Sequence, residues 1–100
     1  MSKQLELIES LIKQAEVMTY KSKESDTVIS RAEMIIGKIF GENSIYLKKL
    51  SNISFIPPIF MTNTPETLFI NSFNSGKNQL LNLLKVMKED IELKDIGLKQ

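Results

Sequence analysis

The sequence contains no cysteine and no histidine. These absences exclude disulfide bonds, zinc fingers, thiol nucleophiles and acid–base chemistry by an imidazole. Arginine is scarce as well, because Arg31 is the only one among thirteen basic residues, and the net charge is +1. Phosphate binding needs a concentrated excess of cations, and base recognition relies on arginine forks. The composition therefore disfavours nucleic acid as a partner.

Long apolar runs are also missing. No stretch approaches the roughly 20 apolar residues that a membrane-spanning helix requires. Glu6 and Glu9 interrupt the region where a signal peptide would carry its apolar core. With 42% hydrophobic and 25% charged residues, the 100-residue chain has the composition of one folded domain. We therefore expect a cytoplasmic protein without a membrane partner.

Two stretches in the first half carry apolar residues at the three- and four-residue spacing of an amphipathic helix. The first predicts a helix that ends near Tyr20, with one face formed by Leu5, Ile8, Ile12 and Ala15. The second predicts a helix that starts with Ser25 or Asp26 as N-cap and ends with Gly41 as C-cap. Its apolar face is wide and comprises Val28, Ile29, Ala32, Ile35, Ile36, Ile39 and Phe40. We therefore expect this second helix to lie centrally in the fold.

The chain between Gly41 and residue 62 has a different pattern. Asn43 or Ser44 can cap a short helix that buries some of Ile45, Leu47 and Leu50. Residues 53–61, "ISFIPPIFM", form what we call the cover segment, in which Pro57 and Pro58 forbid a central strand. We expect extended chain, with at most one short edge strand, that closes one side of the helical core.

The last third predicts one long helix. Asn63 or Thr64 would cap its start, and Pro65 would occupy its first turn. Its apolar row consists of Phe69, Phe73, Gly76, Leu80, Leu84, Met87 and Ile91. Because Gly76 lies on this row, we expect its missing side chain to let another helix come close. The pair Gly76–Lys77 lacks the earlier glycine and the following Ser or Thr of a phosphate-binding loop.

These patterns predict an all-α fold. We expect a small bundle of three to four helices, with one long C-terminal helix and the Pro-containing cover segment. Residues 1–95 would form a single domain, and residues 96–100 a tail or linker that begins near Gly97.

Two groups of charged residues are candidate sites. The acidic group, Glu89, Asp90, Glu92 and Asp95, alternates with lysines and is typical of a salt-bridged surface, whereas catalytic carboxylates need a cleft. The basic group comprises Lys21, Lys23, Arg31, Lys38, Lys48 and Lys49. A solvated surface is its ordinary interpretation, and a nucleic-acid-binding face is the alternative. We expect no enzyme activity, no cofactor and no metal.

The cover segment and the short helix before it hold the candidate interaction residues. They are Tyr46, Phe55, Ile59, Phe60 and Met61. Aromatic and aliphatic side chains that stay exposed on a small domain are typical of a surface for a protein partner or a second copy. The five Met and five Phe leave open an apolar ligand inside the bundle, although core packing is their usual role.

Two stretches resemble a small helical module of bacterial proteins. Arg31 precedes "IIGKIFGENSIYLKKLSNISFIPP", and after a loop comes "INSFNSGKNQLLNLLKVMKEDIEL". In that module a helix ends in Ile-Phe-Gly, an Ile-x-Phe-x-Pro stretch follows, and a long helix carries a glycine near its middle. The module often stands beside TIR-like or other predicted nucleotide-binding domains in defence proteins. The resemblance, over residues 28–93, implies a non-enzymatic protein–protein interaction or oligomerisation module that is accessory to a defence system.

Overall fold

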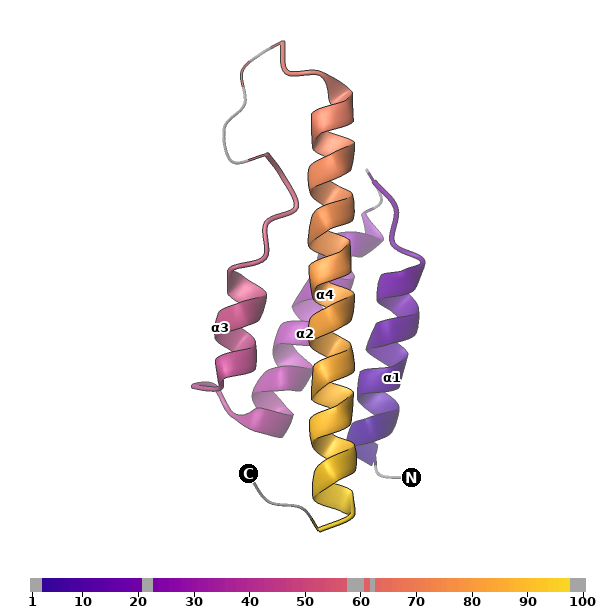
Figure 1. Cartoon of the computed structure of the whole chain (residues 1–100), viewed down its shortest axis with the longest axis vertical. Helices are drawn as coiled ribbons and strands as arrows, with labels where there is room; N and C mark the ends of the chain where they lie inside the picture. The colour runs from indigo at the N-terminus through magenta and orange to yellow at the C-terminus, as the bar shows by residue number, and fades with distance from the viewer. Residues whose placement is uncertain (1–2, 21–22, 58–60, 62, 98–100) are drawn as a thin grey trace.

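The computed structural model describes residues 3–20, 23–57, 61 and 63–97. It contains the helices α1 (Lys3–Glu16), α2 (Glu24–Phe40), α3 (Ile45–Ser51) and α4 (Glu66–Asp95) (Figure 1). The predicted all-α bundle with one long C-terminal helix is therefore confirmed. The described part of the cover segment forms no edge strand.

The four helices form a closed ring. Each helix packs against the next one in the sequence, and α4 completes the ring by packing against α1. The molecule is elongated, with extents of 53 × 23 × 18 Å, and α4 runs along most of its length (Figure 1). The prediction of a central second helix was wrong, because α2 lies between α1 and α3 in this ring. Its wide apolar face serves contacts with two neighbours rather than a position in the middle.

The core lies along the axis of the ring and follows the predicted rows. On α4, Leu80, Leu84 and Met87 are fully buried, and Ile8 and Leu11 meet them from α1. Each such side chain stabilises the fold by about 1.5–3 kcal/mol when it leaves water. The apolar spacing of the sequence therefore located the core correctly on both helices.

Two of the predicted helix caps are confirmed and two are wrong. Gly41 ends α2 with φ 95°, and the Ser44 side chain accepts a hydrogen bond from the Leu47 amide at 3.2 Å. Lys23, however, is the N-cap of α2 and makes no side-chain cap, so neither Ser25 nor Asp26 has that role. Pro65 is the N-cap of α4 with extended backbone and does not lie in the first turn.

Helix α1 ends at Glu16, one turn before the predicted end near Tyr20. The Lys77 ammonium of α4 donates hydrogen bonds to the carbonyl oxygens of Glu16 and Met18, at 2.8 and 3.0 Å. A cation at this position satisfies carbonyl groups that have no partner within the helix. The chain can therefore leave the helix there while Met18 remains buried.

The described part of the cover segment closes the bundle beside α4. Ile53 and Phe55 are half-buried against the core, and Pro57 is buried. A Cβ atom on Gly76 would lie 2.6 Å from Cδ1 of Phe55 and 2.7 Å from the carbonyl oxygen of Ser54. The predicted close approach at Gly76 is therefore present, but its partner is the cover segment and not another helix.

Candidate docking groove between two helices

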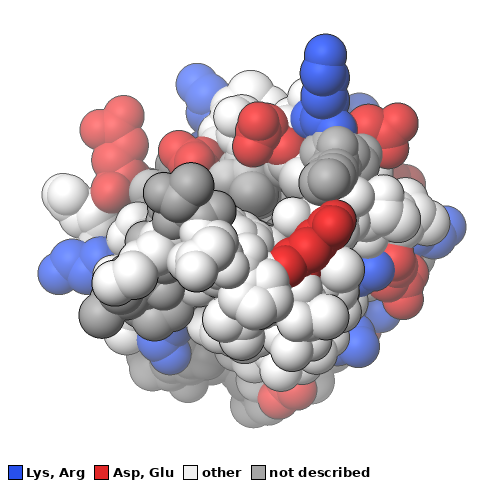
Figure 2. Space-filling model, turned by 90° about the horizontal axis from the view of Figure 1, so that it is seen from above, with Lys and Arg blue, Asp and Glu red and all other residues white. Residues whose placement is uncertain are grey.

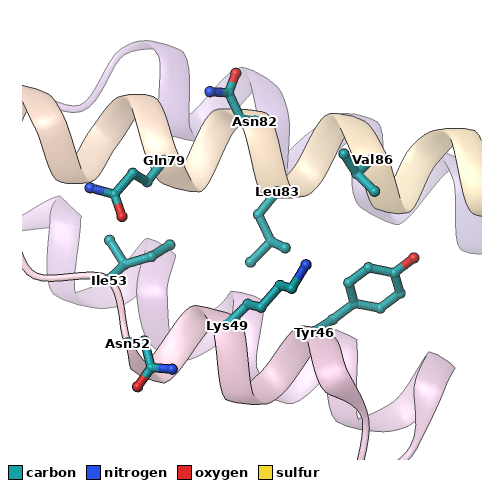
Figure 3. A pocket seen from close by; sticks show the side chains of 8 residues that line it. All are labelled: Tyr46, Lys49, Asn52, Ile53, Gln79, Asn82, Leu83 and Val86. Atoms are coloured by element: carbon teal, nitrogen blue, oxygen red, sulfur yellow. The ribbon is translucent and has the colours of Figure 1, made fainter.

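An open groove of about 410 Å³ runs between α3 and α4. The first wall comes from α3 and the residues after it, and the second from one face of α4. The lining residues are Tyr46, Lys49, Asn52 and Ile53 on the first wall, and Gln79, Asn82, Leu83 and Val86 on the second (Figure 3). Lys49 and Leu83 point into the space between the helices, and the Tyr46 ring reaches towards Val86 (Figure 3).

The sequence explains why this groove stays open. Helix α3 has only seven residues, and Leu50 is its one buried residue. The amide residues Asn52, Gln79 and Asn82 lie at the rim, where close packing would require them to lose water. The apolar floor therefore remains accessible, and Val86 keeps 55% of its surface exposed.

Two charged side chains near the groove have no partner among the residues that the structure describes. Lys49 lines the groove, and Glu89 lies three residues after Val86, which makes them neighbours on the helix surface. Neither Lys49 nor Glu89 forms an ion pair or a side-chain hydrogen bond with another residue in the described part of the chain. The groove therefore combines an apolar floor with a free cation and, beside it, a free carboxylate.

A partly buried hydrogen bond joins the two walls near one end of the groove. The Tyr46 hydroxyl donates to Oδ2 of Asp90 at 2.7 Å, and Asp90 is only 7% exposed. The Lys94 ammonium lies 3.9 Å from Oδ1, which has no hydrogen-bond partner among the described residues. Burial, and then the hydrogen bond and charge of Asp90, raise the pKa of Tyr46 to about 12. The Tyr46 ring also packs edge-on against Phe40, with centroids 4.7 Å apart.

The buried carboxylate corrects one prediction. The acidic group was expected to form an ordinary salt-bridged surface, but Asp90 points inward to Tyr46. The sequence contained a signal for this, because Asp90 follows Leu83 and Met87 at helical spacing on the buried side of α4. A lone acid among apolar positions indicates a specific polar partner.

Of the predicted interaction residues, the structure describes Tyr46, Phe55 and Met61, and it does not bring them together in one site. Tyr46 lines the groove, whereas Phe55 packs against Phe73, with ring centroids 5.9 Å apart. Met61 is 74% exposed, and Ile59 and Phe60 lie outside the described residues. In Figure 2, seen from the end where α4 begins, most charged side chains lie towards the rim. Sequence reasoning missed Val86, and it considered Lys49 only as a member of the basic group.

The basic group of the sequence is spread over several elements. Lys23 precedes α2 and Lys38 lies near its end, about 20 Å away along the helix axis. The Arg31 guanidinium donates to Oγ of Ser10 at 3.2 Å and to Oε1 of Gln14 at 2.7 Å, which ties α2 to α1. Arg31 therefore has a structural role in the bundle, because it links these two helices.

Other kinds of site were searched for in the described residues. They contain no group of three or more acidic, histidine or cysteine side chains that could hold a metal ion. None of the helices formed by these residues has the length and apolar character needed to cross a membrane. Comparison of the chain with protein-family models, with curated proteins and with solved structures gave no match.

Proposed function

We propose that this protein is a non-enzymatic protein–protein interaction module that self-associates through the groove between α3 and α4. The observation that carries the proposal is that exposed Val86 and Lys49 line the groove and Glu89 lies one helical turn after Val86, while neither charge has a partner among the described residues. Exposed apolar residues with polar residues around them are typical of a contact surface.

A second copy suits this surface because the surface is complementary to itself. In a twofold dimer the same patch is used by both copies, so every contact occurs twice. Val86 of each copy would enter the groove of the other, and Lys49 of one copy would meet Glu89 of the other. Both charges would then find partners, and the apolar floor would be covered.

The resemblance to accessory modules of defence proteins supports the same proposal. A module that stands beside an effector domain can act by bringing copies of that effector together. We propose this role in the bacterial cytoplasm for the present protein. It requires no catalytic residue in the groove, where the functional groups are amides, one lysine and one tyrosine.

The experiment is the solution mass by light scattering on a sizing column, over about a hundredfold dilution. Wild-type protein should run as a dimer that dissociates on dilution. Lys49→Glu and Glu89→Lys should each raise the dissociation constant by about tenfold or more, because like charges then face each other. The double variant should restore the dimer, since the charges are exchanged but still paired.

Lys48→Glu is the matched control. Lys48 is exposed on α3 but does not line the groove, so its reversal should leave the dimer unchanged. A wild-type monomer at every concentration would refute self-association. A dimer that tolerates both single reversals would show that another surface makes the contact.

A further inference from the structure

A second pocket, of about 230 Å³, lies at the start of α2, on another side of the bundle from the docking groove. The cover segment and α4 complete its walls. Its apolar lining consists of Tyr20, Ile29, Phe55, Ile56, Phe69 and Phe73. Four of these six side chains are aromatic, and the rings of Tyr20 and Phe73 meet edge-on with centroids 6.3 Å apart.

One buried polar group in this lining is not satisfied. Ser25 is 8% exposed, and its Oγ has no hydrogen-bond partner among the described residues. A buried hydroxyl without a partner is unfavourable, and native structures contain few of them. Since Ser25 lines the pocket, a molecule bound there can supply the missing partner.

We propose that this pocket binds a small neutral compound with one aromatic or aliphatic ring and one hydroxyl or carbonyl group. The ring would lie among the aromatic side chains, and the polar group would form a hydrogen bond with Oγ of Ser25. The size is suitable, because a dry apolar cavity of about 150 Å³ is enough to hold benzene.

The charges around the pocket favour a neutral polar group. Asp26 also lines the pocket, and its carboxylate would repel an anion. Asp26 would attract a cation, but the positive end of the α2 dipole opposes that attraction, and the cation would lose its hydration in a lining that is otherwise aliphatic or aromatic. A hydroxyl or carbonyl group meets neither penalty.

Water is the competing occupant, and the lining argues against it. A bound water needs two to four polar partners. Ser25 and Asp26 can hold one water between them, but a space of about 230 Å³ holds several, and the other described residues that line it are aliphatic or aromatic. Water molecules that fill such a space leave hydrogen bonds unmade, whereas a ring compound does not.

The test is an amide NMR titration with benzyl alcohol and with toluene, which lacks the hydroxyl. Benzyl alcohol should shift the amide signals of Ile29 and Phe73 and bind about tenfold more tightly than toluene, the ratio expected for satisfying one buried hydroxyl. Benzoate and benzylamine should bind more weakly than the alcohol. Absence of shifts at the pocket, or equal affinity for alcohol and toluene, would overturn the proposal.

Two variants separate the effect of the Ser25 hydroxyl on binding from the effect of the pocket volume. Ser25→Ala should abolish the preference for benzyl alcohol and keep toluene binding, whereas Ile29→Trp should fill the pocket and abolish both. Ser30→Ala is the control, because Ser30 is exposed on the same helix and lies outside the pocket. An alcohol preference that survives Ser25→Ala would overturn the role of Ser25. The variants that test self-association, at Lys49 and Glu89, lie outside this pocket, so each proposal can fail without the other.

Discussion

Replacing Gly76 with alanine should destabilise the protein, although alanine is the better helix former. Gly76 lies inside α4, where the change improves helix propensity by about 1 kcal/mol. The new Cβ atom, however, would lie 2.7 Å from the carbonyl oxygen of Ser54 and 2.6 Å from Phe55. Because a backbone atom is involved, a rotamer change cannot relieve the overlap, and such overpacking costs about 1–3 kcal/mol.

Gly37→Ala provides a matched control with the opposite expected sign. Gly37 also lies inside a helix, but a Cβ atom there would meet only Cδ1 of Leu47, at 3.9 Å. This distance is ordinary contact, so the propensity gain should remain and stabilise the protein by about 0.5–1 kcal/mol. For Gly76→Ala the clash should outweigh the gain and leave a net loss of up to about 2 kcal/mol.

The assay is urea unfolding followed by far-UV circular dichroism, since the chain has no tryptophan. In thermal unfolding the two variants should move Tm in opposite directions, by about 4–8 °C for each kcal/mol. Gly76→Ala should also make residues 53–57 more sensitive to proteolysis, because the cover segment must move away from α4. If both variants stabilise the protein equally, the close contact at Gly76 does not exist and the reasoning fails.

Three further predictions concern polar side chains. Tyr46→Phe should cost about 1–3 kcal/mol, because buried Asp90 loses its hydrogen bond. The pKa of Tyr46 is raised from its ordinary value of 10 to about 12 in the folded protein. The free energy of unfolding of the wild type should therefore fall as the pH rises from 10 to 12, and urea unfolding at several pH values should show a smaller fall for Tyr46→Phe. Lys77→Met should cost about 1 kcal/mol in urea unfolding, since the carbonyl groups of Glu16 and Met18 at the end of α1 lose their donor, whereas exposed Lys85→Met should be neutral. Ser25→Ala should raise stability by about 0.5–1 kcal/mol, and a loss instead would show that its hydroxyl has a partner.

The sequence predicted the helices and the core well, because both depend on apolar spacing. The row from Phe73 to Ile91 is buried as a unit on α4. Local chemistry also predicted Gly41 and Ser44, since each cap acts on its own helix. These features need no knowledge of distant residues.

Features that depend on contacts between distant residues were missed. The end of α1 is set by Lys77, which is 61 residues from Glu16 in the sequence. The helical spacing indicates that Asp90 faces inward, but it does not identify its partner Tyr46, which is 44 residues away. No local pattern encodes such pairs. The docking groove was missed for the same reason. It forms where the short helix α3 leaves part of the long helix α4 uncovered, and the sequence does not show how these two helices lie against each other.

The cover segment has a larger role than closing the core. Ile53 lines the docking groove, whereas Phe55 and Ile56 line the pocket beside Ser25. Both proposed sites therefore include residues of one short stretch, and the contact with Gly76 holds that stretch against α4. Because this contact leaves no room for a methyl group, the backbone position of residues 54–55 is fixed between the two sites. The same close contact that makes Gly76→Ala costly thus holds against α4 the residues that contribute to both sites, and a glycine on an otherwise large apolar row is the sequence feature that allows it.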